Sequence, residues 1–429
     1  MTGDEGGTMF DLMGFELKKL LSRRTSLVAC AGILVLLCGI MALNIVQQKT
    51  TSSADETLSG VAAIAQQKER ACAHAGVLAD ERVQEEVAAY KELAFSKVDP
   101  GEVEGLSDAA AYAVMREAYD DEEFRAIYDP YYSYLLSPWN PGGLEPCQVA
   151  ATLDEGAAAG FYEAVADKLQ RALDDGMGGT WEYSEAERAF WTDRQKEVEE
   201  PLSYGYAGGW EDVLACVGFL AFPMVAVCVA LSPVFAGEYQ DRTDAVLLAS
   251  RHGRLRLAAA KVAASLLFAA AYFALSAGIV MGVALAFFGA DGADLPVQVL
   301  ALGIPYDLTM AEAALAAVGL GLLMTLGFAS LALLLSAKLR SQLAVFAICA
   351  ALVFLTAMIP TGGNGALLHV LYLFPINALV DQVLYNSLVS YQAGPFVIDL
   401  AGLLAAAYAA LTLLCAPLAA RAFSRHQVV

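Results

Sequence analysis

The segment FAGEYQDRTDAVLLASRHGRLRLAAAK, Phe235–Lys261, separates two long apolar runs of the chain. Eight of its 27 residues are charged, whereas the runs on either side are almost free of charge. Charged side chains are costly in the core of a bilayer, so a segment of this kind belongs at a membrane surface. We therefore expect the chain to cross a membrane immediately before and immediately after it.

The overall composition also indicates an integral membrane protein. Hydrophobic residues make up 58% of the chain, charged residues only 17%, and the mean hydropathy is +0.52. A membrane-spanning helix needs about 20 apolar residues, and none of the apolar runs alternates like a barrel strand. The sequence predicts an all-α polytopic membrane protein with six transmembrane helices. They are 27–46, 213–235, 258–288, 313–337, 343–360 and 397–420.

Lysine and arginine set the expected orientation, because they are enriched in short cytoplasmic segments. They occur in the N-terminal tail, in the loops after the second and fourth runs, and in the C-terminal tail. The short loops 289–309 and 361–396 contain neither residue. We therefore expect a multi-pass protein of the cytoplasmic membrane with both termini in the cytoplasm.

A large acidic region lies between the first two spans. Residues 47–209 contain 32 Asp and Glu but only 13 Lys and Arg. Long runs rich in Ala, Glu, Gln and Leu predict helices, with Ser107 and Ser184 as N-caps and Glu187 completing a capping box. The region is expected to be an extracytoplasmic helical domain. Its predicted helices are 53–93, with a break near Gly76, 107–128, 152–173 and 184–200.

These assignments define the expected order of domains. A cytoplasmic tail occupies 1–26 and the first span 27–46, followed by the acidic domain 47–209 and by five spans within 210–429. Two cysteines, Cys72 and Cys147, lie in the acidic domain. In an oxidising compartment such a pair predicts a disulfide; two unpaired thiols are the alternative.

The N-terminal tail carries an amphipathic pattern. Apolar side chains fall on one face of a helix over 9–27, and cations lie beside that face. This pattern predicts an interfacial helix that contacts membrane lipids; an ordinary positively charged tail is the alternative. The residues assigned to this helix are Phe10, Met13, Leu17, Lys18, Lys19 and Arg23.

A second unusual segment, 362–394, follows the fifth span. Two apolar half-helices, 364–374 and 376–391, meet at Pro375, with Asn377 just beyond it. Each is too short to cross a bilayer. We expect a re-entrant hairpin that dips into the outer leaflet; a single helix lying on the membrane surface is the alternative.

Several motifs are absent from the sequence. There is no G-x-x-x-x-G-K-[ST] phosphate loop, no set of histidines with zinc-ligand spacing and no recognisable catalytic set. The predicted spans contain almost no ionisable side chains, which argues against a proton- or ion-coupled carrier. We therefore expect no enzyme activity, metal or cofactor in this chain, and any ATP hydrolysis on a separate subunit.

This arrangement resembles the ABC-2 type permeases, the membrane subunits of type-2 ABC exporters. The resemblance rests on the topology and on a loop pattern that Arg242 interrupts, where the family has a glycine. It implies that the loop 236–257 contains a coupling helix that docks on a separate ABC ATPase subunit, which binds ATP and Mg. It also implies a homodimer or a heterodimer with a second permease. The matching residues are Phe235, Glu238, Thr243, Leu247, Leu248, Arg251 and Lys261.

Two other functions remain open from the sequence. A membrane-anchored sensor would use the acidic domain as its ligand-binding head, although a sensor usually needs a cytoplasmic output domain and none is evident in this sequence. An envelope assembly protein would use the same domain to bind other proteins. Nothing in the sequence suggests a nucleic-acid partner, and the substrate of a permease does not follow from the residues.

Overall fold

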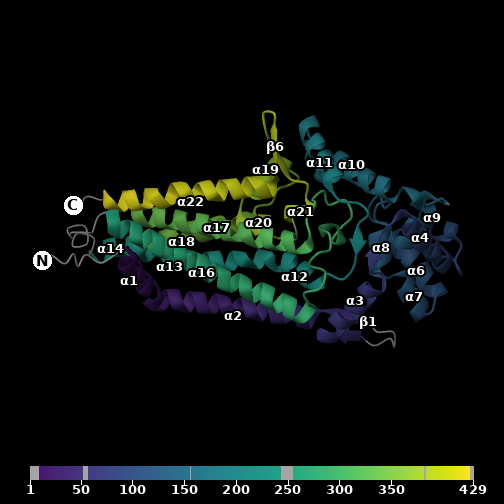
Figure 1. The fold of residues 1–429 in the computed structure, drawn as a ribbon, viewed down its shortest axis with the longest axis horizontal. Coiled ribbons are helices and arrows are strands. Elements are labelled where there is room, and N and C mark those ends of the chain that lie inside the picture. The colour runs from purple at the N-terminus through teal and green to yellow at the C-terminus, as the bar shows by residue number, and fades with distance from the viewer. Residues whose placement is uncertain (1–8, 52–56, 155, 243–254, 381–382, 426–429) are drawn as a thin grey trace.

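The computed structural model describes residues 9–51, 57–154, 156–242, 255–380 and 383–425 of the chain. Figure 1 shows an elongated molecule, with a bundle of long helices at one end and a domain of shorter helices at the other. The first helix and the carboxyl end of the last helix lie at the same end of the bundle, far from the domain. We call this the terminal end of the bundle, and the opposite one the domain end.

Within the described residues, five helical stretches are long and apolar enough to cross a membrane. They are α2 (Arg24–Gln47), the stretch Gly208–Gln240, α16 (Leu255–Phe288), α17 (Met310–Lys338) and α22 (Leu400–Ser424). The stretch Gly208–Gln240 consists of α12 (Gly208–Cys216), the 3-10 turn η2 (Val217–Leu220), α13 (Ala221–Leu231) and α14 (Pro233–Gln240). The prediction of a mostly helical, multi-pass membrane protein is confirmed.

The fifth predicted span, 343–360, is shorter than the others. It consists of α18 (Gln342–Phe354) and the 3-10 turn η4 (Leu355–Met358), 17 residues in all. At 1.5 Å per residue this is roughly 25 Å, less than the hydrocarbon thickness of about 30 Å. The described residues therefore form five membrane-length helices and one shorter apolar helix, where the sequence predicted six full spans.

The predicted hairpin 362–394 is only partly helical. It contains α19 (Gly365–Leu371), α20 (Pro375–Ala378) and α21 (Val383–Asn386), followed by a strand. Pro375 opens α20, and Asn377 Nδ2 donates to the carbonyl of Leu371 at 3.0 Å. The predicted second half-helix, 376–391, is wrong. Leu388 has a φ of 51°, which a right-handed helix does not allow.

In the described part of the chain, three short antiparallel strand pairs accompany the helices, and the all-helical prediction did not include them. They are β1 (Lys49–Thr51) with β2 (Thr57–Ser59), β3 (Gly76–Val77) with β4 (Ser203–Tyr204), and β5 (Ser390–Ala393) with β6 (Phe396–Asp399). In the last pair Ser390 faces Asp399. Because β6 occupies the start of the predicted sixth span, α22 begins only at Leu400.

The domain has a hydrophobic core of its own. Tyr90, Met115, Tyr131 and Phe161 are buried in it, and Leu302 joins them from the loop between α16 and α17. The domain is therefore packed against that loop as well as linked to the bundle through α2 and α12. Its helices are α3 (Val61–Ala73), α4 (Asp80–Ala94), α5 (Pro100–Val103), α6 (Asp108–Ala118), α7 (Asp121–Ile127), α8 (Pro130–Leu135), α9 (Pro146–Thr152), η1 (Ala157–Gly160), α10 (Phe161–Gly179) and α11 (Glu185–Glu197).

The predicted caps are confirmed. Ser107 Oγ accepts a hydrogen bond from Ala110 N at the start of α6. Ser184 and Glu187 form the expected capping box at the start of α11. The predicted helix 107–128 is divided at Asp120, whose carboxylate caps α7 and so starts a new helix there.

The predicted Cys72–Cys147 disulfide is wrong, because both thiols are free. Cys147 is fully buried in the domain core, with Sγ 3.7 Å from the hydroxyl of Tyr128. Burial raises the pKa of the Cys147 thiol. Cys72 is exposed on α3. Neither sequence spacing nor compartment could distinguish these two environments.

The start of α12 is fixed against the end of α16. A Cβ on Gly209 would lie 1.9 Å from the carbonyl oxygen of Gly289, so only glycine allows this approach. Tyr206, just before α12, donates from its hydroxyl to the carbonyl of Phe288 at 2.8 Å. These contacts hold the junction between domain and bundle in place.

Candidate functional site

A cluster of charged side chains is buried at the terminal end of the bundle. Lys261 Nζ lies 2.9 Å from Glu16 Oε2 and 3.0 Å from Glu238 Oε1. Lys19 Nζ lies 2.6 Å from the same oxygen of Glu238. Lys261, Glu238 and Glu16 are only 2%, 5% and 7% exposed. We call these four residues the ion cluster.

The ion cluster joins three elements that are distant in sequence. Glu16 and Lys19 belong to α1 (Met9–Ser22), Glu238 to the last turn of α14, and Lys261 to the start of α16. An unpaired charge at such a buried position costs several kcal/mol. The mutual pairing therefore fastens α1 to both flanks of the charged segment that connects α14 with α16.

α14 is also fixed to the rest of the bundle. Ser336 Oγ, on α17, accepts from the backbone N–H groups of Phe235 and Ala236, each at 3.0 Å, and donates to the carbonyl of Ser232 at 2.7 Å. The ring of Phe235 packs on Phe423 of α22, with centroids 4.8 Å apart. α14 is therefore attached to α17 and α22 as well as to α16.

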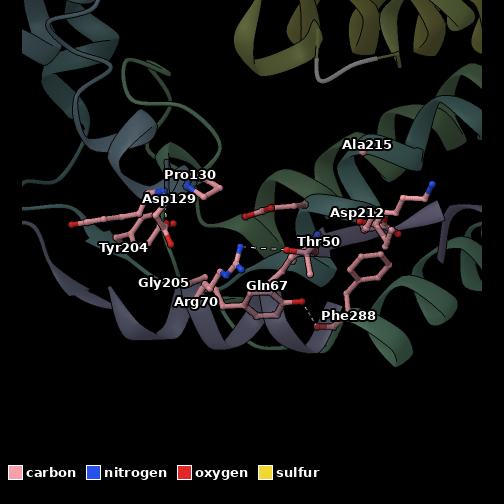
Figure 2. Close-up of a pocket in the computed structure, with 17 residues that line it drawn as sticks. Thr50, Gln67, Arg70, Asp129, Pro130, Tyr204, Gly205, Asp212, Ala215 and Phe288 are labelled. Atoms are coloured by element: carbon pink, nitrogen blue, oxygen red, sulfur yellow. Dashed lines mark hydrogen bonds between the residues drawn. The ribbon is translucent and has the colours of Figure 1, made fainter. Parts of the chain in front are cut away.

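A cavity of about 590 Å³ lies at the domain end, between the domain and the bundle. Its lining comes from β1, α3, the start of α8, the chain around β4, α12 and the end of α16. Figure 2 draws Asp129 and Tyr204 toward one end of the cavity, Asp212 and Phe288 toward the other, and Arg70 between them. This volume is in the range of small-molecule sites, about 300–1,000 Å³.

Five charged residues line the cavity. Lys49 and Arg70 are cationic, and Asp129, Glu211 and Asp212 are anionic. Arg70 Nη1 donates to Thr50 Oγ1 at 3.3 Å. The tyrosines in the lining add no charge at neutral pH, because burial raises the pKa of Tyr204 and that of Tyr206 to about 12.

Asp212 differs from the other charged residues of the cavity. It is 8% exposed, and its Oδ1 accepts from Asn44 Nδ2 at 2.6 Å. Its other oxygen, Oδ2, is buried without a hydrogen-bond partner among the described residues. A buried carboxylate oxygen normally has a donor, so this unsatisfied acceptor beside a cavity requires an explanation.

On another side the domain is fastened to the bundle by polar contacts. Trp191 Nε1 donates to Ser390 Oγ at 3.3 Å, linking α11 to β5. Arg194 Nη1 lies 3.3 Å from Asp399 Oδ2, which also accepts from the hydroxyl of Tyr306 at 3.0 Å. These contacts tie α11 to the start of α22.

The family model for ABC-2 family transporter proteins matches residues 16–415, which is most of the chain. The chain belongs to this family. No curated protein and no solved structure matches it. The resemblance inferred from topology and from the loop is therefore confirmed at the level of the family, and the chain is a multi-pass membrane protein of the ABC-2 transporters.

The predicted coupling residues of this ABC-2 protein fall into two groups. Phe235, Glu238 and Lys261 are buried inside the bundle, so they cannot themselves form a docking surface for another subunit. They hold the flanks of the loop instead. The other predicted coupling residues lie outside the described part of the chain; they are Thr243, Leu247, Leu248 and Arg251.

The predicted interfacial helix corresponds to α1. Phe10 is 80% exposed and Lys18 is exposed, whereas Met13 and Leu17 are half-buried. Two of its cations do not point freely outward as the amphipathic pattern suggested. Lys19 is paired with Glu238, and Arg23 is half-buried, with its Nη1 lacking a partner in the described structure.

Sequence reasoning missed Glu16 and Asp212. Glu16 follows Met13 by three residues and precedes Leu20 by four, so its position on the apolar face of α1 was a readable signal for a buried carboxylate. The apolar run predicts a span that starts at 213, just after Asp212. In the ABC-2 chain the helix begins at Gly208, which places Asp212 in its first turns.

Proposed function

We propose that this chain is the permease subunit of an ATP-driven exporter that works with a separate ATPase subunit. The observation that carries the proposal is the ion cluster. A family known for transport supplies the context, and the cluster supplies a physical connection between both flanks of the 243–254 segment and the bundle. The segment between those flanks is the part that we expect the ATPase to contact.

The proposed mechanism is mechanical coupling. When the ATPase binds and hydrolyses ATP with Mg, it displaces the 243–254 segment. Glu238 and Lys261 are joined through a 3.0 Å ion pair, so α14 and α16 move together and α1 moves with them. Ser336 passes the displacement from α14 to α17. Tilting of these helices would open a path for the substrate.

The proposed orientation follows the distribution of basic residues. The terminal end, where the Lys- and Arg-containing short segments lie, faces the cytoplasm, and the acidic domain faces outward. The functional unit is a homodimer or a heterodimer with a second permease, with the substrate path between the two. Transport then runs from the ion cluster toward the cavity, which is export.

The partner is tested by affinity purification of the tagged chain from its native membrane in mild detergent. An ABC ATPase subunit is expected in the eluate. Arg251→Ala, within the proposed docking segment, should reduce its recovery, whereas Arg340→Ala, an exposed residue on another loop at the terminal end, should not. Absence of an ATPase subunit from the wild-type eluate would contradict the proposal.

The orientation needs its own measurement. Cys72 is exposed on the domain, so a membrane-impermeant maleimide should label it in intact cells. Cys147 is fully buried and serves as the internal control, since it should react only after unfolding. Labelling of Cys72 only in inside-out vesicles would reverse the proposed topology.

A further inference from the structure

We propose that the 590 Å³ cavity binds a cationic amphiphile, a molecule that joins an ammonium group to an apolar or aromatic body. This inference deepens the proposed function by naming a class of substrate, and it rests on that function only for the direction of transport. Binding itself involves only residues of this chain.

The unpaired oxygen of Asp212 is the first argument. The residue is 8% exposed and lines the cavity, and Oδ2 has no partner among the described residues while Oδ1 is held by Asn44. Rotation about the Cβ–Cγ bond of an aspartate is soft, so a ligand can draw the carboxylate round, at the expense of the hydrogen bond from Asn44. A cation with N–H donors, or a quaternary ammonium in contact with the carboxylate, would compensate this buried charge.

The aromatic part of the lining is the second argument. Tyr204, Tyr206 and Phe288 line the same cavity as Asp212. Aromatic faces attract ammonium groups through their quadrupole, and this attraction strengthens when the cation is desolvated. The same rings offer apolar surface to the rest of an amphiphile. Carboxylates next to aromatic rings therefore suit a cation with an apolar body better than a sugar or an inorganic ion.

The balance of charge is the third argument. Three carboxylates line the cavity against two cations, and one of these cations, Arg70, is hydrogen-bonded to Thr50. The surrounding region 47–209 has 32 acidic and 13 basic residues. A strongly acidic surface raises the local concentration of cations and lowers that of anions. The acidic domain thus favours cations at the cavity in addition to covering it.

Binding is tested on the purified full chain in nanodiscs of phosphatidylcholine, without an ATPase. Three matched probes are titrated by isothermal calorimetry: benzyltrimethylammonium, benzyl alcohol and benzenesulfonate. We expect saturable binding of the cation only, weakening as salt is raised. Equal or tighter binding of the sulfonate would overturn the proposal, as would binding of none of the three.

The site is assigned with three variants. Asp212→Asn keeps the shape of the side chain and should weaken cation binding by about tenfold or more, a loss of about 1.4 kcal/mol. Glu211→Gln, next to it in the lining, should weaken binding less. Asp193→Asn removes an exposed carboxylate of the domain, on α11, that pairs with Lys196, and should leave binding unchanged. Unchanged affinity in Asp212→Asn, with an unchanged thermal melt, would refute the assignment.

The two proposals fail separately. If an ATPase co-purifies but the cation does not bind, the permease function stands and the substrate class is wrong. If the cation binds through Asp212 but no ATPase is recovered, the chain has the cavity site without the proposed motor.

Discussion

The two ends of the bundle use the same kinds of side chain in opposite ways. At the terminal end, lysines and glutamates pair at 2.6 to 3.0 Å, and the void beside them is about 10 Å³, room for about one water. At the domain end, charges surround about 590 Å³ of open space, and Asp212 retains an unpaired oxygen. Because its charges are paired, the ion cluster holds helices together. The charged residues of the cavity are incompletely paired, so they are available to a ligand.

The largest expected effect on stability comes from a substitution that breaks the ion cluster. Lys261→Met removes the partner that Glu16 and Glu238 share, and leaves Glu16 buried without its cation. Loss of one partner from a buried pair costs about 3–5 kcal/mol. We expect a much lower melting temperature or loss of the folded chain, measured by thermal unfolding in detergent.

A control and a rescue distinguish this effect from the loss of any lysine. Lys338→Met, at an exposed position of the same end, should be nearly silent. Glu16→Met combined with Lys261→Met should recover most of the stability, because Glu238 keeps Lys19 at 2.6 Å. If Lys261→Met has the same melting temperature as the wild type, the ion cluster does not stabilise the folded chain.

The next largest effect concerns the polar contacts between α11 of the domain and the start of α22. Arg194→Met removes the cation facing Asp399, which is 6% exposed and keeps its hydrogen bond from Tyr306. Partial loss of partners at a buried carboxylate should cost about 1–3 kcal/mol. Hydrogen exchange in α11 and in the β5–β6 pair should accelerate. Lys196→Met on the same helix, where the lysine pairs with exposed Asp193, should leave hydrogen exchange unchanged.

A smaller effect depends on pH. Burial lowers the pKa of Lys168, in α10, to about 8. The unfolded chain therefore binds more protons than the folded one between pH 8 and the ordinary lysine value of about 10.5, so stability should rise with pH across that window. Lys168→Met should raise the melting temperature at pH 7 by about 2–4 °C, equivalent to about 1 kcal/mol, and should flatten the rise. A melting temperature that falls from pH 8 to pH 10 only in the wild type would contradict this.

The smallest effect on stability is expected at Asp212, whose carboxylate is incompletely paired. Asp212→Asn should change stability by less than about 0.5 kcal/mol, because the amide oxygen still accepts from Asn44 and the unpaired charge is removed. Thermal unfolding of this variant beside Lys261→Met is the most direct test of the comparison. Destabilisation by several kcal/mol in both variants would mean that the domain-end charge is structural too.

Local patterns in the sequence predicted much of the fold. Apolar runs located the five membrane-length helices, and the caps at Ser107 and Ser184 follow from spacing alone. These features depend on interactions within a few residues. The strand pair Ser390–Ala393 with Phe396–Asp399 was not predicted, because the apolar run before it also suits a helix and only the positive φ at Leu388 excludes one.

The functional sites were harder to predict because they depend on long-range contacts. Lys261 pairs with Glu16, a residue 245 positions away, and nothing near either residue indicates that pairing. The loop resemblance drew attention to Glu238 and Lys261 as coupling residues, and the structure places both inside the bundle. The cavity is assembled from five separate stretches of the chain, which no local pattern in the sequence indicates.

The pairing of Glu16 with Lys261 also has a consequence for biogenesis. During synthesis Glu16 emerges 245 residues before its cation, which is roughly 12 to 50 s at 5–20 residues per second. Burial of its carboxylate before then would be unfavourable, so we expect α1 to remain at the membrane surface, with Glu16 hydrated, until Lys261 is in place. On this expectation, docking of the first helix follows insertion of α16 and is a late step of assembly.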